Sequence, residues 1–216
     1  MVGYAVKVSF LLKRRLSGSA RRLKLIEAAT FVFASKGYDG ATVEEIAIAG
    51  SVTKPVVYDH FASKPEIFAA AIEKIRDHLL EMGRAAIAKE NAPDGKLNAA
   101  ISVFFDLVQH HPESARVLLI SSKAPSSIAE LCRRIQGEAT AGIAQIMRMN
   151  SASQGRRSER QWYLRAEFTK KGMHGLAEWW LEHPDVPRTE IEEAISSTLT
   201  AGIHGTNKHP RTDKLK

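Results

Sequence analysis

Groups that could bind a phosphodiester backbone or the edges of bases are concentrated between residues 53 and 64. Pro55 is compatible with a helix only in the first turn, where backbone N–H groups have no intrahelical partner. Thr53, two residues earlier, is therefore the expected N-cap of a short helix that runs to about His60. A short helix with an exposed polar N-terminal end fits the major groove of DNA. The run thus predicts a helix that reads DNA.

A second short helix is expected just before it. Thr42 and Glu45 form a capping-box pattern, in which the hydroxyl accepts a backbone N–H three residues on and the carboxylate reaches back. Gly50-Ser51 then ends this helix. Two short helices joined by a tight turn predict a helix-turn-helix between about residues 21 and 61.

Lys64 begins the helix that follows. Ser63 and Glu66 form a second capping pattern at its start. At a helix N-terminus, the backbone dipole and the charge of Lys64 both favour an anion. We therefore expect Lys64 to bind a phosphate of the DNA backbone.

The same stretch resembles a known family signature. The matching positions are Ile26, Ala28, Ala29, Phe33, Gly37, Tyr38, Thr42, Val43, Ile46, Ala47, the run from Val52 to Phe61, Ser63 and Lys64. This pattern is similar to the N-terminal segment of tetracycline-repressor (TetR) family regulators. The resemblance implies an all-helical homodimer, usually a repressor, whose C-terminal domain binds a small molecule and thereby releases DNA.

The resemblance and the positions together assign roles to seven side chains. We expect Lys54, Val56 and His60 to reach base edges, and Thr42, Thr53, Tyr58 and Lys64 to hold phosphates. Phosphate contacts position the helix without reading sequence. Two alternatives stay open: the Tyr58 ring packs within the three-helix unit, and Lys54 is only a solvated surface residue.

The turn departs from the family pattern at one place. Family members typically carry Gly where this chain has Ser51. A positive φ at Ser51 costs about 1 kcal/mol, unless the kink has moved to Gly50. We expect Gly50→Ala to destabilise the protein more than Ser51→Ala.

The excess positive charge lies in front of the helix-turn-helix. The formal net charge is +7, and the first 24 residues hold seven Lys and Arg residues and no acidic one. Such a tail is either a solvated terminus or an arm whose cations neutralise phosphates. A start codon assigned too far upstream would also account for it.

Periodicity predicts an all-α fold with about nine helices, because apolar residues recur at three- and four-residue steps and hairpin signals are absent. We expect a basic extension at 1–19, a helix-turn-helix domain at 20–66, a ligand-binding and dimerisation domain at 67–205, and a tail at 206–216. The helix from Lys64 to about Glu90 is shared by the two domains.

Two apolar helical stripes in the C-terminal half suggest a dimer interface, with Trp180 on the first and Ile191, Ile195 and Leu199 on the second. An ordinary hairpin inside one subunit is the alternative. For the small-molecule effector, whose identity the sequence does not give, we expect Phe104, Phe105, Val108, Met147 and Trp162 to line the pocket.

Other function classes find little support. The sequence has no GxSxG, GxGxxG or Walker pattern, so we expect no enzyme and no cofactor. His110 and His111 are adjacent, point about 100° apart on a helix and lack metal-ligand spacing, so we expect no metal site. We expect neither a signal peptide nor a membrane segment, and a cytoplasmic protein with Cys132 buried. The remaining alternative is an architectural protein that binds DNA without sequence preference or ligand.

Overall fold

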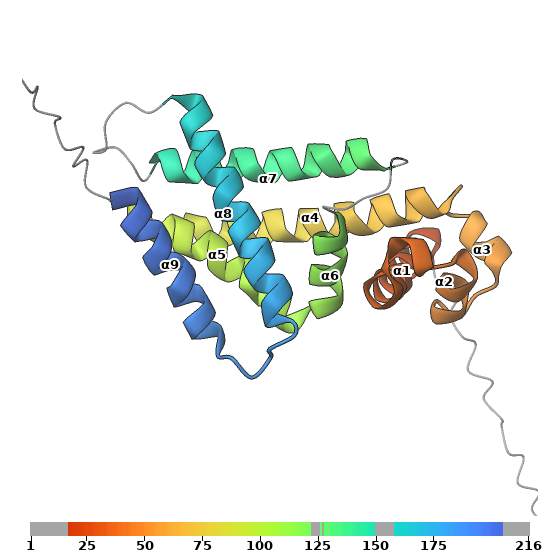
Figure 1. Ribbon diagram of the computed structural model, residues 1–216. Coiled ribbons are helices and arrows are strands. Elements are labelled where there is room, and N and C mark those ends of the chain that lie inside the picture. Colours follow the sequence, from red (N-terminus) through yellow and green to blue (C-terminus); the bar gives the residue numbers. More distant parts are fainter. Residues whose placement is uncertain (1–16, 122–125, 127, 150–157, 205–216) are drawn as a thin grey trace, which may run out of the picture.

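The computed structural model describes residues 17–121, 126, 128–149 and 158–204, and these residues form helices without strands (Figure 1). The helices are α1 (Gly18–Gly40), α2 (Val43–Ala49), α3 (Lys54–Tyr58), α4 (Lys64–Ala88), α5 (Pro93–His110), α6 (Pro112–Ile120), α7 (Ala129–Met149), α8 (Glu159–Trp180) and α9 (Arg188–His204). The predicted all-α fold with about nine helices is confirmed for the described part of the chain. The first helix begins at Gly18, inside the predicted 1–19 extension.

Helices α1, α2 and α3 pack together at one end of the molecule, to the right in Figure 1. Their apolar faces meet in a shared core that contains the fully buried Phe33, Ile46 and Val57. Phe68 of α4 closes this core, with its ring edge-on to Phe33 at 4.9 Å between centroids. Aromatic pairs in this geometry add to the energy of burial, so the small unit is anchored firmly to α4.

Helix α4 connects this unit to the rest of the molecule. Residues in its first half, such as Ile67 and Ile72, are buried in the core under α1, and the later half runs along α5. The helix extends to Ala88, close to the predicted end at Glu90. A continuous helix of 25 residues carries a movement of one end rigidly to the other.

The remaining helices form a bundle around α5. Arg188 fastens α9 to α5, because its Nη1 lies 2.8 Å from Asp106 Oδ1 and its Nη2 donates to the Ser102 carbonyl at 2.8 Å. The short α6 turns back from the bundle and packs against α1. It thus provides a second contact, besides α4, between the helix-turn-helix and the bundle.

Helices α7 and α8 are joined by a buried polar cluster. Lys170 is only 4% exposed, and its ammonium lies 2.8 Å from Glu167 Oε2 and donates to Thr140 Oγ1 at 2.6 Å and to the Gln136 carbonyl at 3.0 Å. Three partners satisfy its three N–H groups, which makes the buried charge tolerable.

None of the described helices is long and apolar enough to cross a bilayer.

Candidate nucleic-acid interface

The start of α2 has the predicted capping box. Glu45 N donates to Thr42 Oγ1 at 3.2 Å, and Thr42 N donates to Glu45 Oε2 at 3.0 Å. A hydrogen bond from Lys36, followed by those from Thr42, lowers the pKa of the Glu45 carboxyl. The Thr42 hydroxyl also donates to Glu45 Oε2. A phosphate contact by Thr42 therefore has to replace this last hydrogen bond.

The turn after α2 has its kink at Ser51. Ser51 has φ 54°, the left-handed region, whereas Gly50 is right-handed helical with φ −77°. The alternative that the kink has moved to Gly50 is therefore wrong. Gly50 is needed for space instead, because a Cβ there would lie 3.0 Å from Leu25 Cδ2 and 3.2 Å from the Ile46 carbonyl oxygen.

The candidate recognition helix, α3, begins where the sequence predicts and ends earlier. Thr53 is its N-cap, but the Thr53 side chain makes no capping hydrogen bond, so the hydroxyl is available to another acceptor or donor. The helix ends at Tyr58, because Asp59 closes it as C-cap. His60 lies in the following turn, where its N–H donates to the Val57 carbonyl at 3.0 Å. The predicted extension of the helix to His60 is wrong by two residues.

The side chains of α3 divide into a buried anchor and an exposed set. Val57 is fully buried and holds the helix against the three-helix core. Tyr58 is 47% exposed, so the alternative in which its ring packs inside the unit is wrong. Lys54 is also exposed, and its ammonium lies only loosely near Glu44 of α2, at 3.9 Å. Val56 and His60 are half-buried beside them.

Lys64 serves the fold and is not placed as the sequence predicts. Its ammonium donates to the carbonyls of Tyr38 at 2.9 Å and Ala41 at 3.0 Å, approaches that of Asp39 at 3.5 Å, and lies 4.5 Å from the Tyr38 ring centroid. Carbonyls at the end of a helix lack intrahelical partners and attract cations. The end of α1 therefore takes up the charge that was expected to bind a phosphate.

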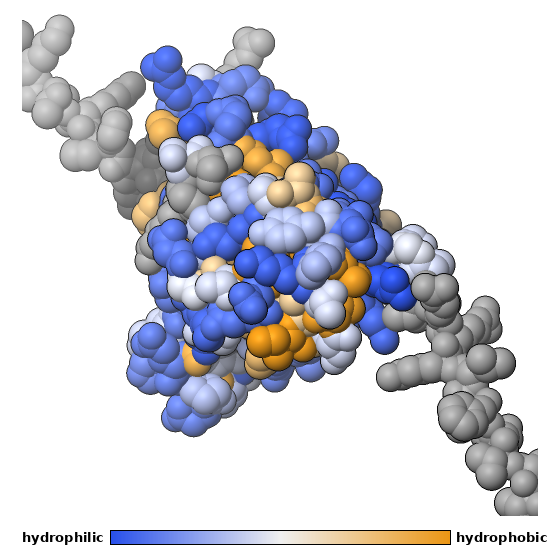
Figure 2. All heavy atoms as spheres, turned by 90° about the vertical axis from the view of Figure 1, so that its right-hand side faces the viewer, coloured by the Kyte–Doolittle hydropathy of each residue, from blue (hydrophilic) through white to orange (hydrophobic). Residues whose placement is uncertain are grey.

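The surface at this end of the molecule is mostly hydrophilic, with smaller hydrophobic areas between (Figure 2). Arg21, Arg22 and Lys24 lie in the first turns of α1. The Arg22 guanidinium stacks on the Phe61 ring at 4.4 Å. The other four cations of the predicted basic tail, Lys7, Lys13, Arg14 and Arg15, lie outside the described residues.

The predicted dimer-interface residues pack inside their own subunit. Trp180 is 6% exposed and its Nε1 donates to the Val186 carbonyl at 2.8 Å, and Ile191 is buried as well. Ile195 and Leu199 are half-buried against the same core. The prediction is wrong for Trp180 and Ile191, because a residue buried within one subunit cannot also contact another. The alternative, a helix hairpin packed inside one subunit, therefore accounts for Trp180 and Ile191.

Helix α8 carries a second apolar stripe, which is not among the residues predicted from the sequence. Leu164, Phe168 and Trp179 are exposed large apolar side chains on this helix. Gly172 and Gly175 lie between them, and a Cβ on either would meet nothing within 4 Å. Helical spacing could have revealed this stripe, but it does not tell which of two apolar stripes faces outward.

The predicted ligand residues are buried core residues. Phe104, Phe105, Val108, Met147 and Trp162 all have little exposed surface. Three hollows in the described part of the chain are lined by other residues. Two of the three meet at His78, Leu107 and His111, next to α4. None of the five lines these three hollows, so their role in ligand binding stays a prediction.

Comparisons with known proteins agree with this geometry. Residues 25–71 match the family described as bacterial regulatory proteins, tetR family. The HTH-type transcriptional activator FasR of Mycolicibacterium smegmatis is 36% identical over 104 residues, which are 48% of this chain and 48% of FasR. The HTH-type transcriptional repressor KstR2 of Mycobacterium tuberculosis is 28% identical over 106 residues, 49% of this chain and 52% of KstR2. The match thus spans about half the length of these curated relatives.

Solved structures extend the similarity to the whole fold. A TetR-like transcriptional regulator from Rhodococcus sp. RHA1 has a TM-score of 0.75 at 20% identity, over 89% of this chain and 100% of that one. The fatty acid degradation regulator FadR from Bacillus halodurans has a TM-score of 0.72 at 17% identity, over 83% and 97%.

The fold and the exposed face of α3 define a helix-turn-helix DNA-binding protein. Residues 25–71 carry the N-terminal, DNA-binding segment of the tetR family of bacterial regulatory proteins, as the sequence signature predicts.

Proposed function

We propose that the protein is a homodimeric repressor that binds a palindromic operator and releases it when a small molecule binds to the helices beyond the helix-turn-helix. The observation that carries this proposal is the division of α3, which exposes Lys54 and Tyr58 while Val57 anchors it. A helix held by one buried side chain and exposed on its other faces is suited to enter a groove.

The exposed groups of α3 suit two kinds of contact. Lys54, Val56 and His60 are the candidates for base edges, and Tyr58 and Thr53 are the candidates for phosphates. The Thr53 hydroxyl makes no capping hydrogen bond, which leaves it able to donate to a phosphate oxygen. Thr42 at the start of α2 is a further candidate that would exchange its bond to Glu45.

The outward stripe of α8 supports the homodimer. Phe168 is 73% exposed, and Gly172 follows one turn later with no neighbour to obstruct a close approach. On α9, the small residues Ala194 and Thr198 are exposed too. Two such helices from each subunit can form a four-helix bundle about a two-fold axis. A dimer is required because two recognition helices must meet half-sites about 34 Å apart.

Competition binding tests the proposal. We expect the full-length protein to bind DNA from its own upstream region at least about 10³-fold more tightly than random DNA at physiological salt. Lys54→Ala should weaken this binding, whereas Lys89→Ala, at the far end of α4, should not. Equal competition by the two DNAs would reject a sequence-specific regulator and favour the architectural alternative.

A further inference from the structure

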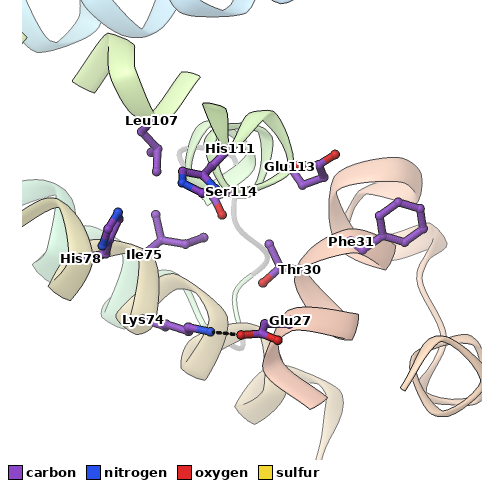
Figure 3. Close-up of a pocket in the computed structure, with 10 residues that line it drawn as sticks. All are labelled: Glu27, Thr30, Phe31, Lys74, Ile75, His78, Leu107, His111, Glu113 and Ser114. Atoms are coloured by element: carbon purple, nitrogen blue, oxygen red, sulfur yellow. Dashed lines mark hydrogen bonds and ion pairs between the residues drawn. The ribbon is translucent and has the colours of Figure 1, made fainter. Parts of the chain in front are cut away.

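A cleft of about 470 Å³ lies where the helix-turn-helix meets the bundle (Figure 3). Helix α1 forms one wall, α4 another, and the end of α5 with the start of α6 covers them. The lining residues are Glu27, Thr30, Phe31, Lys74, Ile75, His78, Leu107, His111, Glu113 and Ser114. The volume is in the range of small-molecule sites, roughly 300–1,000 Å³. A ligand here would touch the first helix of the DNA-binding unit directly.

An ion pair crosses the base of the cleft. Lys74 Nζ of α4 lies 2.8 Å from Glu27 Oε1 of α1, and both side chains are well exposed. An exposed pair of this kind contributes little to stability. A competing anion that also gains contacts with the cleft can therefore replace Glu27 as the partner of Lys74.

Apart from the Glu27 carboxylate, the polar groups that face the cleft have hydrogen-bond donors. Figure 3 shows Ser114 and His111 pointing into the space from above and Thr30 from the side, while the Glu113 carboxylate points away. The Thr30 hydroxyl already donates to the Ile26 carbonyl at 2.8 Å. Together with Lys74, Ser114 and His111 can donate to a carboxylate from two sides. This arrangement favours an anionic ligand group over a cationic one.

An apolar strip on α4 leads away from this polar end. A second hollow of about 230 Å³ shares His78, Leu107 and His111 with the first and continues between α4 and α5. Ile75, Leu79 and Met82 line the two hollows along successive turns of α4. The combined shape is a groove with an apolar strip along α4, while Ser102, Asp106 and Arg188 also line the second hollow.

We propose that this groove is the effector site and that it takes a small carboxylate with an unbranched apolar tail. The inference rests on the proposed function, which requires an effector. The carboxylate binds Lys74, Ser114 and His111, and the tail lies along Ile75 and Leu79. Because Lys74–Glu27 joins α4 to α1, its exchange for a ligand removes a link that positions the helix-turn-helix. The ligand and the operator then favour different positions of the helix-turn-helix. Ligand binding therefore lowers the affinity for the operator.

Calorimetric titration of the full-length protein with octanoate tests the site. We expect one octanoate per chain, bound at least tenfold more tightly than octylamine or octanol. Lys74→Gln should weaken octanoate binding at least tenfold. Glu27→Gln should strengthen it about threefold, because the competing carboxylate is gone. If the ion pair had only a structural role, Lys74→Gln and Glu27→Gln would change the octanoate affinity in the same direction.

Two further variants serve as block and control. Ser114→Phe fills the cleft and should abolish octanoate binding, with the fold checked by circular dichroism. Arg148→Gln removes an exposed ion pair with Glu159 elsewhere and should bind octanoate like the wild type. Octanoate should lower the operator affinity of the wild type and leave that of Ser114→Phe unchanged.

Several outcomes would overturn the site. These are no binding of octanoate, equal binding of octylamine, or unchanged binding by both Lys74→Gln and Ser114→Phe. Operator binding measured on the same samples separates the two levels. If the wild type binds its operator specifically but does not bind octanoate, only the proposed site is refuted. If the wild type does not bind an operator specifically, the proposed function is refuted.

Discussion

Trp179 and Trp180 are neighbours in sequence but lie on different faces of α8. Trp180 is buried and its ring lies 5.9 Å from that of Phe105, measured between centroids. Trp179 is 43% exposed and stacks on His183 with 4.1 Å between ring centroids. Adjacent residues on a helix point about 100° apart, so one tryptophan packs inside the subunit while the other lies at its surface.

The outward face of α8 gives the first prediction. Phe168→Arg should convert the dimer to monomers, because it places a charge in an apolar interface, and operator affinity should fall at least tenfold. Analytical ultracentrifugation measures the change. Met149→Arg is the matched control, since Met149 is an exposed apolar residue at the end of α7. A Phe168→Arg protein that remains dimeric would contradict this interface.

The strained turn gives the second prediction. Ser51→Gly should raise the free energy of unfolding by about 1 kcal/mol, because Gly adopts a φ of 54° without a Cβ clash. Ser51→Ala should be close to neutral, since both residues carry a Cβ. Gly50→Ala should destabilise through its contact with Leu25. Urea denaturation of the three variants checks the order, and a destabilised Ser51→Gly would refute it.

The position of Lys64 gives the third prediction. Lys64→Met should lower the free energy of unfolding by on the order of 2 kcal/mol, because charged hydrogen bonds to the Tyr38 and Ala41 carbonyls are lost. The slope of operator affinity against salt should stay the same. Lys54→Met is the matched control, with unchanged stability and altered DNA binding. If Lys64→Met had the wild-type melting temperature and a salt slope lower by about one, Lys64 would contact a phosphate after all.

Local chemistry accounts for what the sequence predicts well. The capping box of Thr42 and Glu45 and the first-turn Pro55 act within a few residues, so the starts of α2 and α3 could be predicted from the chain alone. Lys64 could not, because its acceptors belong to the end of another helix. The choice between Trp179 and Trp180 likewise depends on what α5 covers.

The candidate ligand site shows the same limit. Phe104 and Phe105 are buried aromatic residues, and neither of them lines the cleft. The cleft arises instead where α1, α4 and α6 meet, and polar residues such as Lys74 and Ser114 line it. Composition predicts which residues avoid water, whereas the location of a cavity depends on how whole helices are placed.

The fourth prediction concerns acid sensitivity. Burial, and then the charges of Lys170 and Lys171, lowers the pKa of His174 to about 4, although Glu167 acts in the opposite direction. His174 also stacks on Phe104 with 5.5 Å between ring centroids. Its pKa in the unfolded chain is about 6.5. The folded state thus favours the neutral imidazole, and its stability contribution is present above pH 6.5 and is lost as the pH falls toward 4.

Replacing His174 isolates this effect. Between pH 6.5 and 4.5, the wild type should lose on the order of 2 kcal/mol of unfolding free energy through His174. His174→Gln should lose less by that amount, because glutamine does not take up a proton. The carboxyls of Asp106 and Glu167 have lowered pKa values, and because both proteins keep these carboxyls, their own effect on stability is common to the two curves. Urea titrations at several pH values measure the difference, and parallel curves for the two proteins would show that His174 is not responsible.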